Sequence, residues 1–322
     1  MALEDIVNKI TKRFGKESVS QTIPDVEFLT SGSLSLDLAL GGGYAKGRVI
    51  EVDGWESSGK TTLALHAVAN VQKEGKIAAY IDTEHALNLN YAEALGVQVG
   101  GDKWILSQPT NAEEALEIAR ELAKEKEIGI IVLDSIASFV PKCVLQGEAG
   151  DQKMGVLARL LSMWLPTLIP DIQRTGCIVF AINQFREKIG VMYGSPTTTP
   201  GGNALKFYCS QKLEITRMGS EKDGDEVYAN KIKVTVRKNK VAPPFRTANF
   251  YIRFGQGIDL EREILDLAIE FDIVKKSGSW LSYGDTKLGQ GVDNVREVLL
   301  NNPDLFELIF KQVKEKYEAE QS

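Results

Sequence analysis

One glycine-rich stretch of the chain has the residue types and spacing of a phosphate-binding loop. Residues Gly54 to Thr61 follow the pattern G-x-x-x-x-G-K-[ST] and lie between a strand-like run and a helix-like run. The glycines let backbone N–H groups approach phosphate oxygens, Lys60 can reach the β- and γ-phosphates, and the Thr61 hydroxyl can bind Mg²⁺. A chance match in a glycine-rich turn is the alternative, and the flanking strand and helix argue against it.

Two carboxylates follow other strand-like runs and could complete a site for phosphoryl transfer. Such chemistry needs a second group at the metal and a group that orients water. Asp134 ends the apolar run 128–134 and is the candidate at the metal. Glu84 can activate water, although an acidic residue that favours a helix start is the alternative. His85 beside it belongs to no group with metal-ligand spacing, and a lone histidine is more often structural.

A polar pair leads into the second of two glycine-rich stretches. A predicted strand ends in Asn183-Gln184, and the Gln184 amide can sense the γ-phosphate just before the stretch 185–202. The first stretch covers residues 147–155. Long loops inside a compact domain are usually functional, although surface loops without a function are the alternative.

Strand-like and helix-like runs alternate around these residues. The predicted order is strand 48–53, helix from 60, strand 77–82, helix 91–95, strand 104–107, helix 112–126, strand 128–134 and strand 177–183. This alternation predicts an α/β fold with a mostly parallel sheet covered by helices. Runs at 212–216, 231–237 and 248–254 predict an antiparallel extension of that sheet.

The two ends of the chain differ from this core. Apolar residues at 3, 6, 7, 10 and 14 share one face of a predicted helix, which needs a partner surface. After residue 257 the chain becomes acidic, with predicted helices at 261–270, 294–300 and 303–317. We therefore expect an N-terminal helical arm (1–30), an ATPase-type core (31–258) and a small α-rich C-terminal domain (259–322).

The composition is that of an ordinary globular chain. Its 322 residues are 43% hydrophobic and 25% charged, enough for about two domains. No apolar run approaches the roughly 20 residues that span a bilayer, and the first residues do not resemble a secretory signal. Three widely spaced cysteines favour a reducing compartment over a disulfide framework. We expect a cytoplasmic protein with no membrane partner.

A net charge of −6 does not exclude a nucleic-acid partner, because the charges are unevenly distributed. Residues 259–322 contain 8 Lys and Arg against 14 Asp and Glu, which leaves 30 of each kind before residue 259. Residues 230–246 contain six basic residues and no acidic one. A local anion-binding surface is therefore compatible with the acidic total.

These motifs, in this order, resemble the RecA family of bacterial recombinases. The resemblance covers nearly the whole chain and rests on residues 30–37, 56–62, 81–87, 154–155, 188–192, 201–207 and 238–240. Many NTPases share a phosphate loop, whereas this whole set is specific to the family.

The resemblance implies an ATP and Mg²⁺ site that is completed by a neighbouring subunit. The implied nucleotide-binding residues are Gly54, Glu56, Ser57, Ser58, Gly59, Lys60, Thr61, Thr62, Asn88, Tyr91 and Asp134, with Thr61 and Asp134 at the metal. Tyr91 would stack on adenine, Glu84 would be the general base and Gln184 the phosphate sensor. By the same resemblance, Lys238 and Lys240 reach the neighbour's γ-phosphate, Phe207 relays ATP binding across the interface, and the first helix packs on the next protomer.

The two glycine-rich stretches match the family's DNA-binding loops. The implied DNA contacts are Met154, Gly155, Arg159, Ser162, Arg186, Lys188, Ile189, Gly190, Gly201, Gly202 and Asn203. Their types supply a reason, because glycine amides approach phosphates closely and the apolar Met154 and Ile189 can separate stacked bases. A core role for these two residues is the alternative, and their polar, glycine-rich neighbours disfavour it. Base pairing between strands would then read the sequence.

Several positions depart from the family pattern. Trp55 stands where proline is common, and Asn88 stands where aspartate is common. Pro166 replaces an arginine that often contacts DNA phosphate, and with Pro170 it is expected to break a helix. Glu187 adds a negative charge beside the second loop.

The resemblance implies an ATP-dependent recombinase that forms filaments on single-stranded DNA, binds duplex DNA and exchanges homologous strands in recombination and repair. It also implies stimulated self-cleavage of a LexA-type repressor. One alternative is a ring-forming DNA helicase, which would need a separate tracking or primase-binding domain. Another is a nucleotide-gated interaction protein without a DNA role, which the two loops and the paired lysines disfavour.

Overall fold

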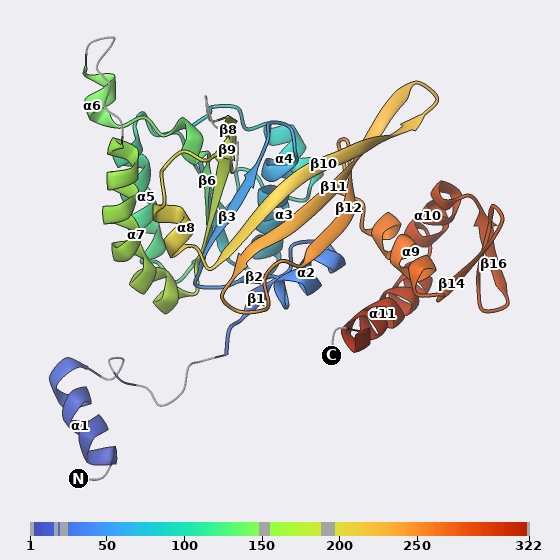
Figure 1. The fold of residues 1–322 in the computed structure, drawn as a ribbon, viewed down its shortest axis with the longest axis horizontal. Helices are drawn as coiled ribbons and strands as arrows, with labels where there is room; N and C mark the ends of the chain where they lie inside the picture. The colour runs from blue at the N-terminus through green and yellow to red at the C-terminus, as the bar shows by residue number, and fades with distance from the viewer. Residues whose placement is uncertain (1–2, 16–18, 20–24, 148–154, 188–196, 321–322) are drawn as a thin grey trace.

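A large mixed sheet forms the centre of the molecule (Figure 1). The computed structural model describes residues 3–15, 19, 25–147, 155–187 and 197–320. Within them, nine strands pair in the order β13-β12-β11-β10-β3-β7-β6-β4-β5. The parallel strands are β10 (Gln211–Asp223), β3 (Val49–Gly54), β7 (Ile178–Gln184), β6 (Ile128–Asp134), β4 (Ile77–Asp82) and β5 (Trp104–Ser107). The antiparallel extension is β11 (Glu226–Asn239), β12 (Thr247–Arg253) and β13 (Gly257–Ile258). The predicted α/β fold is confirmed.

Helices cover both faces of the parallel strands (Figure 1). One face packs on α2 (Leu34–Leu40), α3 (Lys60–Lys73) and α4 (Leu89–Ala94). The other packs on α5 (Ala112–Ala123), α7 (Val156–Thr175) and α8 (Ala204–Tyr208). Strand β6 shows why its sequence is a continuous apolar run: Ile130 and Val132 enter the first core, and Ile131 and Leu133 enter the second.

Short elements tie the connections to this core. Strand β1 (Phe28–Leu29) pairs with β2 (Tyr44–Ala45), and β8 (Arg186–Glu187) pairs with β9 (Thr197–Thr198). A 3₁₀ turn, η2 (Ile136–Ser138), and the short helix α6 (Lys142–Leu145) follow β6. The β8–β9 pair therefore forms the base of the second glycine-rich stretch.

Helix α7 continues through both of its prolines, so the prediction that Pro166 and Pro170 break it was wrong. The two prolines are exposed and four residues apart, whereas the buried face of the helix carries Leu161, Trp164, Leu165, Leu168 and Ile172. A proline leaves the carbonyl four residues earlier without its N–H donor. Those carbonyls belong to the exposed Ser162 and Pro166, where water can bind them.

The C-terminal part contains the predicted helices and a small sheet that was not predicted. Helices α9 (Leu260–Glu270), α10 (Val292–Leu300) and α11 (Pro303–Glu320) share one apolar core with the strands β14 (Val274–Ser277), β15 (Trp280–Tyr283) and β16 (Thr286–Gln290). Buried Glu263 of α9 accepts hydrogen bonds from the Ser33 hydroxyl and the Ser35 N–H, both at 2.8 Å. This carboxylate thus ties α9 to the start of α2.

The N-terminal helix α1 (Leu3–Phe14) forms as predicted and has no buried residue. Figure 1 shows it away from the central sheet. Its apolar face therefore lacks a covering surface among the described residues. No helix in the described part of the chain combines the length and apolar character needed to cross a bilayer.

Candidate nucleotide and DNA sites

The phosphate loop lies between the end of β3 and the start of α3, as its motif predicts. Gly59 has a φ of 100°, in the left-handed region that favours glycine. A Cβ atom at Gly54 or Gly59 would lie 2.6 Å from a methyl carbon of Ile215 or 2.5 Å from one of Ile252. Both glycines are therefore required by close packing against the neighbouring strands β10 and β12.

Lys60 is 6% exposed and is held by the loop itself. Its Nζ donates hydrogen bonds to the carbonyl oxygens of Gly54 (3.1 Å) and Trp55 (2.7 Å). Burial lowers the pKa of Lys60, and the carboxylates of Asp134 and Glu84 oppose that shift. The ammonium group therefore sits where the loop can present it to a phosphate.

Thr61 and Asp134, the two candidates at the metal, are in direct contact. Thr61 Oγ1 donates to Asp134 Oδ2 at 3.2 Å, and the buried Tyr80 hydroxyl donates to the same oxygen at 2.5 Å. Burial raises the pKa of Asp134 to about 6, although these two hydrogen bonds oppose the rise. No group of three or more His, Cys, Asp or Glu side chains suited to a metal occurs in the described residues. A hydroxyl and a carboxylate beside a phosphate loop fit Mg²⁺, which usually shares its coordination with phosphates and water.

Glu84 and Gln184 lie against each other beside the phosphate loop. Gln184 Nε2 donates to Glu84 Oε1 at 2.8 Å, and the Ser135 hydroxyl donates to the same oxygen at 2.5 Å. Glu84 is exposed two residues after β4, and Gln184 ends β7. The sequence could place both residues at strand ends, but it could not predict this contact. The candidate base and the candidate sensor therefore form one hydrogen-bonded unit.

A cavity of about 390 Å³ adjoins the phosphate loop. Residues 57–62 and Tyr91 line it, and the Tyr91 hydroxyl is 3.0 Å from Thr62 Oγ1. The buried Ser58 hydroxyl, also in this lining, has no hydrogen-bond partner among the described residues. A phosphate oxygen could accept a hydrogen bond from this hydroxyl, so the cavity fits the implied nucleotide. Asn88 is outside the lining and caps α4 by accepting from the Tyr91 N–H at 3.0 Å.

Sequence reasoning missed part of this lining. Strand β10 and the antiparallel extension with the residue after β12 supply further residues to the cavity, namely Arg217, Asn230, Ile232, Ile252 and Phe254. It missed a buried network beneath the loop as well, where Lys212 Nζ lies 2.7 Å from Glu51 and 2.5 Å from Asp53. Acidic residues on a buried strand were a signal for such a network, because buried carboxylates require a partner.

The residues expected at the subunit interface belong to two elements that are joined. Lys238 Nζ donates to the carbonyl oxygens of Lys206 (2.8 Å) and Phe207 (3.0 Å) at the end of α8. The Phe207 side chain is 65% exposed, and Lys240 is exposed directly after β11. Lys238 thus ties β11 to the helix that carries Phe207.

The ends of the two glycine-rich stretches meet on α7. Gly155 precedes the helix with a φ of 80°, and Arg159 and Ser162 are exposed on its first turns. A Cβ atom on Gly201 or Gly202 would lie 2.6 Å from Leu161 or 2.9 Å from Ala158 of the same helix. Asn203 begins α8, and Arg186 donates to the Ala137 carbonyl at 3.1 Å. The remaining expected DNA contacts lie outside the described residues, namely Met154, Lys188, Ile189 and Gly190.

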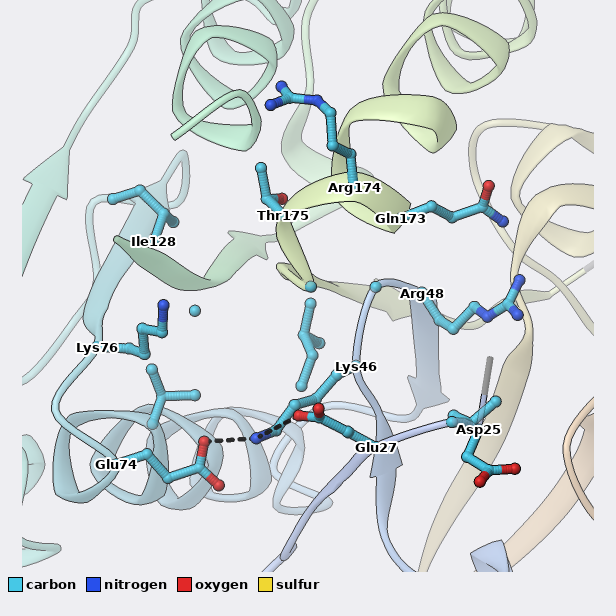
Figure 2. Close-up of a pocket in the computed structure, with 16 residues that line it drawn as sticks. Asp25, Glu27, Lys46, Arg48, Glu74, Lys76, Ile128, Gln173, Arg174 and Thr175 are labelled. Atoms are coloured by element: carbon cyan, nitrogen blue, oxygen red, sulfur yellow. Dashed lines mark hydrogen bonds and ion pairs between the residues drawn. The ribbon is translucent and has the colours of Figure 1, made fainter. Parts of the chain in front are cut away.

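Another cavity, of about 590 Å³, lies at the opposite end of the parallel strands. Figure 2 shows basic side chains around it, including Lys46, Arg48, Lys76 and Arg174. Lys46 Nζ contacts the carboxylates of Glu74 (2.7 Å) and Glu27 (3.7 Å). This cavity adjoins the amino ends of the strands, whereas ligands of parallel α/β sheets bind at the carboxyl ends. It is therefore separate from the nucleotide site.

The fold and these contacts define an α/β protein with a P-loop nucleotide site. A family model described as the RecA N-terminal domain matches residues 1–259, and one described as the RecA C-terminal domain matches residues 262–318. The chain belongs to the RecA family, whose members act as recombinases in DNA recombination and repair. The family consists in general of DNA-dependent ATPases that bind DNA and form filaments.

Individual relatives match over nearly their full length. Protein RecA of Porphyromonas gingivalis is 51% identical over 319 residues, which are 98% of this chain and 93% of that protein. Protein RecA of Bacillus subtilis is 50% identical over 321 residues, or 98% of this chain and 92% of that protein. The crystal structure of the RadB recombinase matches with a TM-score of 0.55 and 26% identity, covering 72% of this chain and 98% of that one.

Proposed function

We propose that this chain assembles as an ATP-dependent filament on single-stranded DNA, binds duplex DNA and exchanges homologous strands. The observation that carries the proposal is the hydrogen bond between Glu84 and Gln184. Gln184 lies two residues before β8 at the base of the second glycine-rich stretch, so a change at Glu84 would reach a candidate DNA-binding segment within a few residues. Membership of the RecA family also supports this proposed function.

The residues around the P-loop suit ATP with Mg²⁺. Lys60 and Ser58 would bind the phosphates, Thr61 and Asp134 would hold the metal, and Tyr91 would contact the base. Bound ATP would supply the phosphoryl group that is transferred to water. Glu84 would orient the attacking water and accept its proton. When Glu84 takes up this proton, its acceptor strength falls, and the hydrogen bond from Gln184 weakens.

Assembly would complete the site. Lys238 and Lys240 would contact the γ-phosphate of the neighbouring protomer, and Phe207 would lie in the same interface. Residues 1–30 would serve as the polymerisation arm, 31–258 as the ATPase core and 259–322 as a terminal domain. The filament, acting on DNA in the cytoplasm, would also stimulate self-cleavage of a LexA-type repressor.

Two assays on the purified chain test this function together. Single-stranded DNA should raise ATP turnover at least tenfold, on the order expected when assembly completes a catalytic site. Homologous duplex DNA should then give joint molecules, and heterologous duplex should not. ATP turnover that DNA stimulates, together with rings in electron micrographs, would indicate a helicase instead. ATP turnover that does not change when DNA is added would indicate a nucleotide-gated switch.

A further inference from the structure

We propose that Trp55 and Phe185 form a positioning contact that couples the phosphate loop to the second glycine-rich stretch. The inference deepens the proposed function and rests on it. Trp55 follows the first glycine of the phosphate loop. Its side chain meets the residue that follows Gln184, beside the phosphate loop.

Two contacts join these segments. The rings of Trp55 and Phe185 are arranged edge to face, with centroids 5.8 Å apart and planes at 66°. The Phe185 N–H also donates to the Gly54 carbonyl at 3.3 Å. Because one contact uses side chains and the other uses backbone, the two segments are held in both position and orientation.

The contact does not belong to the core packing of the domain. Trp55 is 45% exposed, and Phe185 is partly buried. Neither residue is part of the hydrophobic clusters formed by the described residues on the two faces of the sheet. A large aromatic pair at the rim of a nucleotide site therefore has a local role, since folding of the core does not require it.

Lys60 links this pair to the nucleotide. Its ammonium group donates to the Trp55 carbonyl at 2.7 Å and shares the Gly54 carbonyl with the Phe185 N–H. A phosphate is a stronger partner for an ammonium group than a neutral carbonyl is. Lys60 would turn toward a bound phosphate, and the backbone at Gly54 and Trp55 would lose one partner at each carbonyl. The indole and the backbone bond would pass that change to Phe185.

Phe185 can transmit the change because it directly precedes β8. Strand β8 (Arg186–Glu187) pairs with β9 (Thr197–Thr198), so a shift of Phe185 moves the base of the second glycine-rich stretch. Gln184 provides a separate connection through Glu84. Two adjacent residues thus report on two parts of the nucleotide site, Gln184 on the hydrolytic carboxylate and Phe185 on the phosphate loop.

The test compares the stimulation of ATP turnover by single-stranded DNA in matched variants. Trp55→Ala and Phe185→Ala should each reduce the stimulation factor by about two- to tenfold, the range expected for one aromatic pair. Trp55→Phe should retain it to within about twofold, because a phenyl ring preserves the contact. The double variant should lose no more than the worse single variant. Trp280→Ala, at a 51% exposed tryptophan of β15, is the control and should change nothing.

A second readout does not depend on DNA. Addition of ATP should change the tryptophan emission of the wild-type protein, Trp55→Phe should remove that change, and Phe185→Leu should reduce it. If DNA fails to stimulate ATP turnover by the wild-type protein, the proposed function is wrong. The tryptophan emission of the variants then still tests whether Trp55 and Phe185 couple the two segments. Additive losses in the double variant, or an emission change that survives Trp55→Phe, would overturn the coupling role. So would parallel losses of ATP affinity and melting temperature in Trp55→Ala, which indicate a merely structural residue.

Discussion

Glu84 Oε1 accepts hydrogen bonds from Ser135 and Gln184, which makes a conservative test of its role possible. Glu84→Gln keeps an oxygen that can accept both bonds but cannot take a proton from water. We expect turnover to fall by about 100-fold or more, the usual contribution of a general base. The dissociation constant for ATP should change by less than about threefold, measured by titration with a fluorescent nucleotide.

Lys60→Ala is the contrasting variant. It removes the buried ammonium group of the phosphate loop, so ATP affinity itself should fall, and nucleotide-dependent assembly should fall with it. If Glu84→Gln weakened ATP binding as much as Lys60→Ala, Glu84 would be a binding residue and its assignment as the base would be wrong.

The site residues that the sequence predicted are those fixed by motif and strand end. Lys60 and Thr61 follow from the loop pattern, and Asp134 follows because it ends a buried strand beside that loop. Arg217 and Phe254 line the cavity beside the phosphate loop but could not be predicted. Their positions depend on the pairing of β10, β11 and β12. That pairing includes register shifts between β10 and β11, which no local sequence pattern indicates.

At the scale of elements, the unbroken α7 predicts that its prolines lower stability. Pro166→Ala would give the Ser162 carbonyl a backbone donor and should stabilise the protein by about 1–3 kcal/mol. Pro166→Arg should stabilise it similarly and should also place a cation on the exposed face that carries Ser162. Thermal unfolding measures the first effect, and DNA binding at several salt concentrations measures the second.

The two substitutions at Pro166 separate helix stability from DNA contact. The arginine variant should bind single-stranded DNA more tightly than the alanine variant. Its affinity should also fall more steeply with salt concentration, because its binding would release about one more ion from the DNA. Equal affinities and equal salt slopes for the two variants would show that this face of α7 does not meet DNA phosphate.

Elements with a clear apolar pattern were predictable, whether the folded chain buries them, as in β6, or leaves them exposed, as in α1. Strands β5 and β6 have the predicted bounds because their apolar runs are bordered by polar residues. The β10–β11 hairpin extends well beyond the predicted strands because the outer part of β10, residues 217–223, is largely exposed and carries no apolar alternation. Strand β14 was missed for a similar reason, since only Val274 of its four residues is buried.

The junction between α2 and α9 predicts a pH-dependent stability. Burial raises the pKa of Glu263 from an ordinary value near 4.5 to about 7, and the Ser33 and Ser35 hydrogen bonds oppose the rise. The stability contributed by the protonated carboxyl is fully present below pH 4.5 and is lost as the pH rises through 7. The side chain of the Glu263→Gln variant cannot ionise. The free energy of unfolding of this variant, relative to that of the wild type, should therefore rise between pH 5 and 8, by up to roughly 3 kcal/mol.

Chemical denaturation at several pH values measures this gain, with Glu270→Gln as the control. Glu270 is exposed on the same helix, so its replacement should give a difference from the wild type that stays nearly constant with pH. A constant difference for Glu263→Gln too would mean that Glu263 does not change its charge state on folding.

At the scale of the whole molecule, the chain presents an apolar helix face that its own described residues do not cover. Leu3 is 64% exposed, Ile6 40% and Phe14 65%, and all three share one side of α1. An amphipathic helix gains most of its stability from packing that face. A second copy of the chain is the expected partner, in keeping with the filaments formed by the family.

Ile6→Glu would place a charge on this apolar face and should weaken assembly by about tenfold to 100-fold, because burial of one isoleucine contributes roughly 1.5–3 kcal/mol. Asn8→Glu adds the same charge on the opposite side of the helix and should leave assembly nearly intact. Sedimentation and electron microscopy with ATP and single-stranded DNA measure the difference, and nucleotide titration should give equal ATP affinities for the two isolated variants. Filaments of normal length from Ile6→Glu would show that the arm does not hold neighbouring protomers together. An equal loss of assembly in both variants would show that charge, rather than the apolar face, controls assembly.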